Sequence, residues 1–204
     1  MIFPCRGLYA ITPDGLPAEI LLPQVEAALQ GGVAVVQYRE KNEQLRHATA
    51  QSLKSLCDQY NIPLLINDDY KLAALIGADG VHLGRHDQSI SMARSYLGEH
   101  AIIGISCYND VEQARFAEQQ GASYVAFGRF FPSGTKPLAS PAELKTLTQA
   151  KQQINLPIVA IGGILPNNGQ QLLLAGADLL AVVGGIFDSE PLQSALDFRA
   201  LFNM

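Results

Sequence analysis

The sequence has no long apolar segment and no linker rich in proline, serine or charge. Its apolar runs are far shorter than the roughly 20 residues that a membrane-spanning helix needs, so no membrane association is expected. The opening residues "MIFPCRGLYAITPDG" also lack the charged start and apolar centre of a signal peptide, which predicts a cytoplasmic protein. Without a linker, residues 1–204 are expected to form a single domain.

Basic clusters and cysteine pairs are missing as well. The formal net charge is −5, and nucleic-acid binding is not expected because proteins that bind the phosphate backbone concentrate lysine and arginine. The three cysteines, Cys5, Cys57 and Cys107, have no close-pair spacing, and an odd number in a cytoplasmic chain predicts free thiols. The few basic residues are therefore informative by their positions.

Short apolar runs rich in β-branched residues recur along the chain. They are "GLYAIT" (7–12), "VAVVQYR" (33–39), "PLLIND" (63–68), "GVHLG" (80–84), "IIGIS" (102–106), "YVAFGRF" (124–130), "PIVAIGG" (157–163) and "LLAVVGGI" (179–186). Near-continuous hydrophobicity is typical of parallel strands that are buried on both faces. Segments with helical spacing lie between them; "NDVEQARFAEQQG" (109–121), for example, begins with an Asn cap and ends at a Gly.

A weak internal repeat supports the strand count. "GGVAVVQ", "GADGVHLG", "GASYVAFG" and "GADLLAVVG" begin at residues 31, 77, 121 and 176 and precede every second expected strand. A unit of two strands and two helices used four times predicts an α/β fold, a single (β/α)8 TIM barrel. An open, doubly wound sheet is the alternative. In the barrel, active sites lie at the carboxyl ends of the strands, so residues at those ends are candidates for function.

The second expected strand ends in "VQYREK". Because strand side chains alternate, Gln37, Arg39 and Lys41 share one side, and Tyr38 and Glu40 share the other. An amide and two cations at the mouth of the barrel suit an anionic ligand. The alternative is a polar rim in which Arg39 is paired with a neighbouring acid.

Carboxylates follow the next two strands. Asn67, Asp68 and Asp69 end the third strand, and Asp87 follows the fourth. Asp69 is expected to cap a helix that begins at Tyr70. Asp68 and Asp87 then remain as oxygen donors for Mg²⁺, which binds through one or two carboxylates and substrate phosphates. A salt bridge from these acids to Arg39 or Lys41 is the competing explanation.

Two kinds of loop could bind phosphate. After the sixth strand, Ser133, Gly134, Thr135 and Lys136 offer amides, hydroxyls and a charge, although an ordinary turn would look the same. Glycine pairs at 162–163 and 184–185 end the seventh and eighth strands, where this fold commonly binds phosphate. They could instead relieve crowding at the rim. Two anion-binding halves would suit two phosphorylated substrates, and the metal half suits a diphosphate leaving group.

The chain resembles the thiamine-phosphate synthase (thiamine-phosphate pyrophosphorylase) family. The matching segments are "GLYAIT", "VQYREK", "LLINDDYKLAALIGADGVHLG..D", "IIGIS", "YVAFGRFFPSGTK", "PIVAIGGI" and "AGADLLAVV", between residue 7 and about residue 186. The resemblance implies a transferase of thiamine biosynthesis on a (β/α)8 barrel. It would join hydroxymethylpyrimidine diphosphate to hydroxyethylthiazole phosphate, or its carboxylate, and release pyrophosphate by a dissociative route.

The resemblance also implies roles for individual residues. Asp68 and Asp87 would bind Mg²⁺, and the catalytic residues would be Arg39, Lys41, Ser106 and Lys136. Substrate binding would involve Gln37, Tyr38, Arg39, Glu40, Lys41, Asn67, Ser106, Ser133, Gly134, Thr135, Lys136, Gly163, Val183 and Gly184. No protein nucleophile is required, and His82, inside the fourth strand, is expected to be a core residue. A homodimer is also implied.

Three positions depart from the family pattern. Arg85 and His86 follow "GVHLG" where a Gln is common, Ser133 replaces a Thr, and Gly184 replaces a Ser. Ser133 keeps a hydroxyl and Gly184 keeps its amide, whereas Arg85 adds positive charge near Asp87. Two other functions are possible on this barrel: a thiazole tautomerase, which would need a proton-transferring residue but no metal and diphosphate set, and a phosphate-ligand sensor without catalysis.

Overall fold

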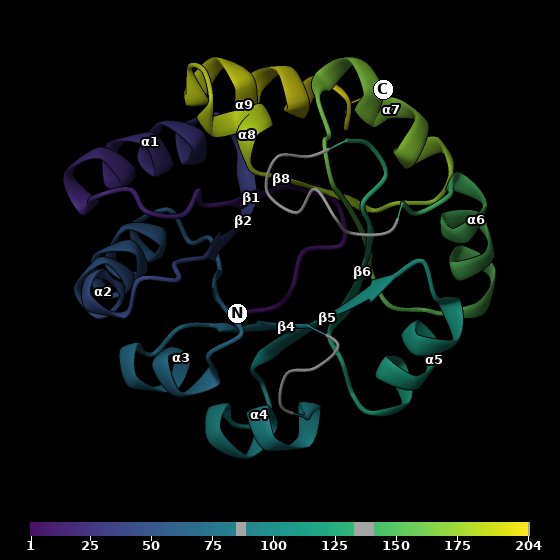
Figure 1. The fold of residues 1–204 in the computed structure, drawn as a ribbon, viewed down its shortest axis with the longest axis horizontal. Coiled ribbons are helices and arrows are strands. Elements are labelled where there is room, and N and C mark those ends of the chain that lie inside the picture. Colours follow the sequence, from purple (N-terminus) through teal and green to yellow (C-terminus); the bar gives the residue numbers. More distant parts are fainter. Residues whose placement is uncertain (85–88, 133–140, 204) are drawn as a thin grey trace.

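The computed structural model describes residues 1–84, 89–132 and 141–203, and its strands form one closed barrel (Figure 1). All neighbouring strands are parallel and follow chain order, and β1 pairs with β8 to close the ring. The strands are β1 (Gly7–Ile11), β2 (Val33–Tyr38), β3 (Leu64–Asn67), β4 (Gly80–Leu83), β5 (Ile102–Tyr108), β6 (Tyr124–Gly128), β7 (Ile158–Ile161) and β8 (Leu179–Val182). Closure excludes the open-sheet alternative and confirms the predicted (β/α)8 barrel.

Helices surround the barrel, as Figure 1 shows. They are α1 (Ala18–Gln30), α2 (Glu43–Gln59), α3 (Tyr70–Ile76), α4 (Ile90–Leu97), α5 (Val111–Gln119), α6 (Leu144–Gln153), α7 (Pro166–Leu174), α8 (Gly184–Phe187) and α9 (Pro191–Ala200). The short helix α8 begins with the Gly184–Gly185 pair, so these glycines start a helix and do not extend β8. In this fold, a short extra helix after the eighth strand commonly helps to bind phosphate.

The structure has two apolar cores. The larger core fills the space between the strands and the helices and includes Leu8, Val36 and Leu180. The smaller core lies inside the barrel and includes Tyr9, Val35 and Tyr124, with Phe3 from the segment before β1 packed against it. Burial on both faces explains why the strands read as almost continuous hydrophobic runs.

Two helix caps show how well local patterns predicted the helix starts. Asp69 caps α3 as predicted, because its Oδ1 accepts a hydrogen bond from the Leu72 amide at 2.9 Å. The predicted Asn cap of α5 is wrong, since Asp110 accepts from the Gln113 amide at 3.1 Å. The neighbouring Asn109 instead accepts a bond from the Glu143 amide on the next helical segment.

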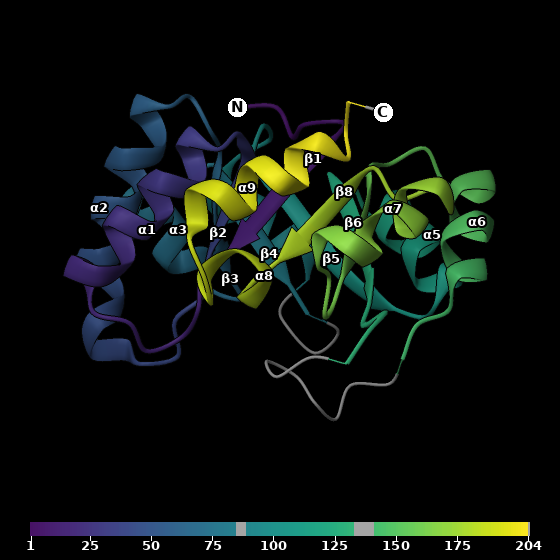
Figure 2. The ribbon, with the colours of Figure 1, turned by 90° about the horizontal axis from the view of Figure 1, so that it is seen from above.

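Both termini lie at the end of the barrel where the strands begin, away from α8 (Figure 2). Cys57 and Cys107 are buried and Cys5 is exposed, and all three are free thiols as predicted. Among the described residues, no helix is both long and apolar enough to cross a membrane.

Candidate active site

A cavity of about 980 Å³ opens at the carboxyl ends of the strands, and every strand or the loop after it contributes to its wall. The wall contains most of the predicted site residues that the structure describes: Gln37, Arg39, Lys41, Asn67, Asp68, Ser106, Gly163, Val183 and Gly184. The volume lies within the range of small-molecule sites, which is about 300–1,000 Å³. The barrel therefore brings together residues that are far apart in the sequence, as expected for residues at the carboxyl ends of its strands.

One side of the cavity carries the cations at the end of β2. Arg39 Nη1 lies 3.2 Å from Asp14 Oδ2, and Asp14 Oδ1 accepts a hydrogen bond from the Lys41 amide at 2.8 Å. Partial burial would raise the pKa of Asp14, but the Lys41 amide bond and the charges of Arg39 and Lys41 keep it below its usual value. Arg39 thus lines the cavity, as an anion-binding role requires. It also has an acidic partner, as expected if it belonged to a polar rim.

Tyr38 and Glu40 point away from this cavity, in agreement with the alternation along β2. Tyr38 is buried outside the cavity wall, and burial raises its pKa to about 12. Glu40 is also buried, and its carboxylate accepts hydrogen bonds from the amides of Gly15 at 3.0 Å and Asn42 at 2.7 Å. The structure therefore does not bring these two residues to the ligand space. Glu40 instead ties the β1–α1 loop, which carries Asp14, to the end of β2.

The end of β3 places an amide and a carboxylate in the wall. Asp68 has a left-handed backbone, with φ of 64°, and its Oδ2 accepts a hydrogen bond from Asn67 Nδ2 at 2.6 Å. Arg46 supports this turn, because it pairs with Asp69 Oδ2 at 3.3 Å and donates to the Asn67 carbonyl at 3.4 Å. Non-glycine residues in this conformation cluster at functional sites because the surrounding structure must hold them there. Tyr108, at the end of β5, also lines the cavity and has φ of 56°.

The floor of the cavity contains His82, which sequence reasoning had assigned to the core. The ring is half-buried and lines the cavity, and its Nε2 lies 2.9 Å from Ser106 Oγ. Gln37 Nε2 donates to Tyr9 Oη at 2.7 Å on the same floor. An apolar run in a parallel barrel strand contains both outward and inward positions, so periodicity alone could not show that His82 points inward.

The glycine pairs after β7 and β8 also line the cavity, and they have a packing role as well. A Cβ at Gly162 would lie 2.3 Å from Arg129 Cβ, and one at Gly163 would lie 2.2 Å from the Pro132 carbonyl oxygen. Similarly, a Cβ at Gly184 would lie 2.3 Å from Asp188 Oδ2. The glycines thus allow neighbouring backbone and side chains to approach closely, as the crowding alternative expected. They also leave the amides at the start of α8 beside the cavity.

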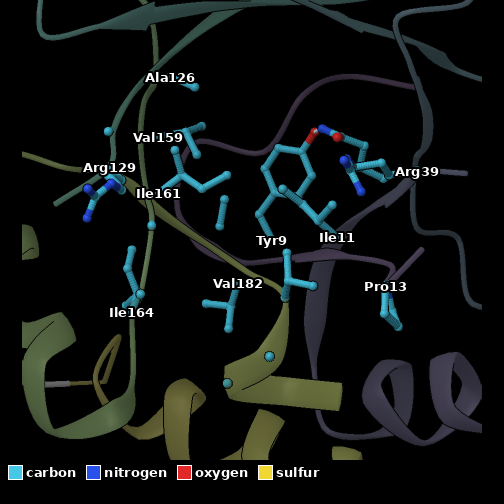
Figure 3. A pocket seen from close by; sticks show the side chains of 18 of the residues that line it. Tyr9, Ile11, Pro13, Arg39, Ala126, Arg129, Val159, Ile161, Ile164 and Val182 are labelled. Carbon is cyan, nitrogen blue, oxygen red and sulfur yellow. Dashed lines mark hydrogen bonds between the residues drawn. The ribbon is translucent and has the colours of Figure 1, made fainter. Parts of the chain in front are cut away.

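Arg129 is a wall residue that sequence reasoning missed. It follows β6 directly and lines the cavity. In Figure 3, Arg39 and Arg129 lie on opposite sides of the view, with Tyr9, Val159 and Ile161 between them. The signal was present in "FGRF", where an arginine directly follows a strand-end glycine. The cavity therefore has a cation on each side of a partly apolar floor.

Five of the predicted site residues, Asp87, Ser133, Gly134, Thr135 and Lys136, lie outside the described residues, as do Arg85 and His86.

The fold and cavity define a (β/α)8 barrel enzyme whose mouth combines cations with glycines at the ends of the seventh and eighth strands, which is typical of phosphate-ligand barrels. The chain belongs to the thiamine monophosphate synthase family, whose model matches residues 8–186. The family membership and the transferase class predicted from the sequence are thereby confirmed.

Individual relatives agree with this placement. The chain is 54% identical over 193 residues to the thiamine-phosphate synthase of Nitrosococcus oceani, covering 93% of this chain and 89% of that one. It is 50% identical over 204 residues to the enzyme of the same name from Methylococcus capsulatus, covering 98% and 91%. The solved thiamine phosphate pyrophosphorylase of Pyrococcus furiosus superimposes with a TM-score of 0.86 at 29% identity, covering 97% and 95%.

Proposed function

We propose that the chain is a thiamine-phosphate synthase. It couples hydroxymethylpyrimidine diphosphate with hydroxyethylthiazole phosphate, or with the carboxylate form of that thiazole, and releases pyrophosphate. The observation that carries this proposal is one cavity whose wall combines the cations Arg39, Lys41 and Arg129 with the strand-end glycines Gly163 and Gly184. Relatives that carry this name, and that the chain matches over 89% and 91% of their length, support it.

The reaction needs no proton transfer from the protein. The bond between the pyrimidine methylene carbon and a diphosphate oxygen breaks, and its electron pair leaves with pyrophosphate. The thiazole nitrogen then donates its lone pair to that carbon and forms the new C–N bond. Because negative charge grows on the departing diphosphate, Arg39 and Lys41 stabilise it most strongly as the bond breaks. Asp14 keeps the Arg39 guanidinium in place for this role.

The family implies Mg²⁺, and the described residues fit this ion in type. Asp68 provides an exposed carboxylate in the cavity wall, and Asp87, outside the described residues, would provide the second. Mg²⁺ binds through one or two carboxylates and keeps several waters, so it does not require a cluster of three acidic ligands. Bound Mg²⁺ would neutralise part of the diphosphate charge.

Three further parts of the proposal rest on the sequence and the resemblance. They are that residues 1–204 act as one catalytic domain, that the chain works in the cytoplasm, and that it forms a homodimer. Light scattering coupled to size exclusion would test the dimer, because a mass near the 22.0 kDa of one chain would contradict it.

The coupling activity is tested with purified protein, both substrates and Mg²⁺. Thiamine phosphate is oxidised to thiochrome phosphate and detected by fluorescence, with EDTA as the control for metal. Product that requires both substrates and metal supports the synthase. A folded protein that isomerises the thiazole but forms no product would support the tautomerase alternative, and one that only binds phosphates would support the sensor.

A further inference from the structure

A chain of hydrogen bonds crosses the interior of the barrel below the cavity and connects side chains from β1, β2, β4, β5 and β6. Gln37 Nε2 donates to Tyr9 Oη at 2.7 Å, and Tyr9 Oη lies 2.8 Å from Tyr124 Oη. Tyr124 Oη lies 2.8 Å from His82 Nδ1, and His82 Nε2 lies 2.9 Å from Ser106 Oγ. Gln37 and Ser106, at the two ends, both line the cavity.

With the Gln37 amide nitrogen as the donor at one end, a single direction satisfies every bond in this chain. The Gln37 Nε2 group can only donate, so the Tyr9 hydroxyl proton is directed to Tyr124. The Tyr124 proton is then directed to Nδ1 of His82, which must be an unprotonated acceptor. A neutral imidazole carries its hydrogen on the other nitrogen, so Nε2–H donates to Ser106 Oγ. The Ser106 hydroxyl proton is thereby left to be donated into the cavity.

Packing holds the centre of this chain in place independently of its hydroxyl group. The Tyr124 ring stacks on Phe3, with 4.0 Å between ring centroids and 7° between planes. On β5, a Cβ at Gly104 would lie 1.9 Å from the Tyr124 ring, so only glycine leaves room for it. Tyr124 is fully buried and does not form part of the cavity wall. Its hydroxyl can therefore influence a ligand only through its neighbours.

The two tyrosines keep their protons at physiological pH. Burial raises the pKa of both Tyr9 and Tyr124 above the ordinary value, since a phenolate would be poorly solvated inside the barrel. Each tyrosine therefore remains able both to accept and to donate a hydrogen bond, which a relay of this kind requires.

We propose that Tyr124 is a positioning residue: through this one-directional chain it sets the proton position on His82 and holds Ser106 as a hydrogen-bond donor to an acceptor atom of the substrate. On the proposed function, on which this last step rests, that atom is a ring nitrogen of the pyrimidine. Hydrogen-bonded chains polarise their members, so a donor fixed in this way is stronger than a freely rotating hydroxyl.

The proton order can be measured without any substrate. Histidine side chains of the full chain labelled with ¹⁵N give long-range ¹H–¹⁵N correlations that identify which ring nitrogen carries hydrogen, and His82→Gln assigns the signal. We expect Nε2–H in the wild type. Gln37→Glu places an acceptor at the head of the chain, so at mildly alkaline pH, where the introduced carboxyl is ionised, every bond should reverse and His82 should carry Nδ1–H. Gln30→Glu, an exposed position on α1, is the matched control.

Transmission through Tyr124 is tested by breaking the chain at its centre. In a Tyr124→Phe background, Gln37→Glu should no longer change the His82 tautomer. Tyr124→Phe alone should lower kcat/KM about tenfold, the usual effect of a lost buried hydrogen bond, mainly by raising KM for the pyrimidine diphosphate. Tyr60→Phe, whose hydroxyl bonds to Gln30 and Glu26 outside the cavity, should leave activity unchanged.

Two results would overturn the proposal. One is a wild-type His82 that carries its proton on Nδ1, which is the order expected if the Gln37 amide oxygen faced Tyr9. The other is a tautomer that does not respond to Gln37→Glu in a folded protein. Because both are read without substrate, they are independent of whether the wild type makes thiamine phosphate.

Discussion

Asp14 and Arg39 form an ion pair at the cavity mouth, with Asp14 Oδ2 3.2 Å from Arg39 Nη1. The pair connects the loop after β1 to the end of β2, and the same carboxylate also binds the Lys41 amide. Its geometry orients the guanidinium that we assign to the diphosphate. Asp14 should therefore affect catalysis through Arg39, although we assign it no contact with the substrate.

Replacing Asp14 tests this orientation. Asp14→Asn keeps an acceptor for the Lys41 amide but removes the charge, and we expect kcat/KM for the pyrimidine diphosphate to fall roughly two- to fivefold, as for other partly exposed ion pairs. Glu112→Gln, which removes an exposed partner of Arg115 on α5, is the control. Equal kinetics for wild type and Asp14→Asn would show that Arg39 does not depend on this partner.

The same pair predicts a pH dependence of stability. Because the folded state lowers the pKa of Asp14 from 3.8, its carboxylate stabilises the fold at neutral pH, and this contribution decreases as pH falls through the lowered pKa. The difference in melting temperature between wild type and Asp14→Asn should be constant near neutrality and shrink below pH 3.8. Thermal unfolding followed by circular dichroism at several pH values measures this difference in melting temperature. A difference that grows in acid would contradict a lowered pKa of Asp14.

Arg129 should affect the second substrate. Arg129→Gln removes a cation opposite Arg39, so KM for the thiazole phosphate should rise by about tenfold or more, while KM for the pyrimidine diphosphate changes little. Arg115→Gln, which alters an exposed arginine on α5, should change neither constant. A rise confined to the pyrimidine diphosphate would place Arg129 in the other half of the site.

Asp68 should determine the response to metal. Asp68→Ala is expected to abolish Mg²⁺-dependent coupling and leave the barrel folded, because one proposed carboxylate ligand is lost. Asp68→Asn should share this loss of activity. It should tolerate the left-handed backbone at this position better than Asp68→Ala does, since Asn adopts that conformation readily. Initial rates during Mg²⁺ titration measure both variants. Near-normal turnover with unchanged metal dependence would refute the metal assignment.

Comparing Gly163→Ala with Gly77→Ala separates the cost of a strained backbone from the cost of crowding. Gly77→Ala, at φ of 67° with no atom within 4 Å of the new Cβ, should cost only about 1–2 kcal/mol for the left-handed backbone. Gly163→Ala, at φ of 62°, would also place its Cβ 2.2 Å from the Pro132 carbonyl, so it should lose more unfolding free energy. Urea unfolding compares the two variants, and equal losses would mean that the segment around Pro132 moves aside.

The fold was predictable because its pattern is repeated. Strands buried on both faces gave eight apolar runs, and the strand-end rule then placed Arg39, Lys41, Asn67 and Asp68 in one cavity. The alternation along β2 also separated Gln37 and Arg39 from Glu40 correctly.

Contacts between distant strands could not be predicted in the same way. His82 lies within an apolar run, and the run does not show whether its side chain points into the barrel or out of it. Its inward direction depends on the barrel register, which pairs it with Gly104 on β5. The partner of Arg39, Asp14, comes from a loop whose path the sequence pattern does not specify. Likewise, the sequence left open whether the glycines at 162–163 bind a ligand or relieve crowding, and their packing partners at residues 129–132 became visible only in three dimensions.

Measuring both products of one reaction mixture would test the synthase assignment decisively. Thiamine phosphate and pyrophosphate are quantified together over time, with each substrate and Mg²⁺ omitted in turn. We expect the two products to appear in equal amounts and only in the complete mixture. Pyrophosphate release without thiamine phosphate, or no release by folded protein supplied with metal, would contradict the synthase assignment.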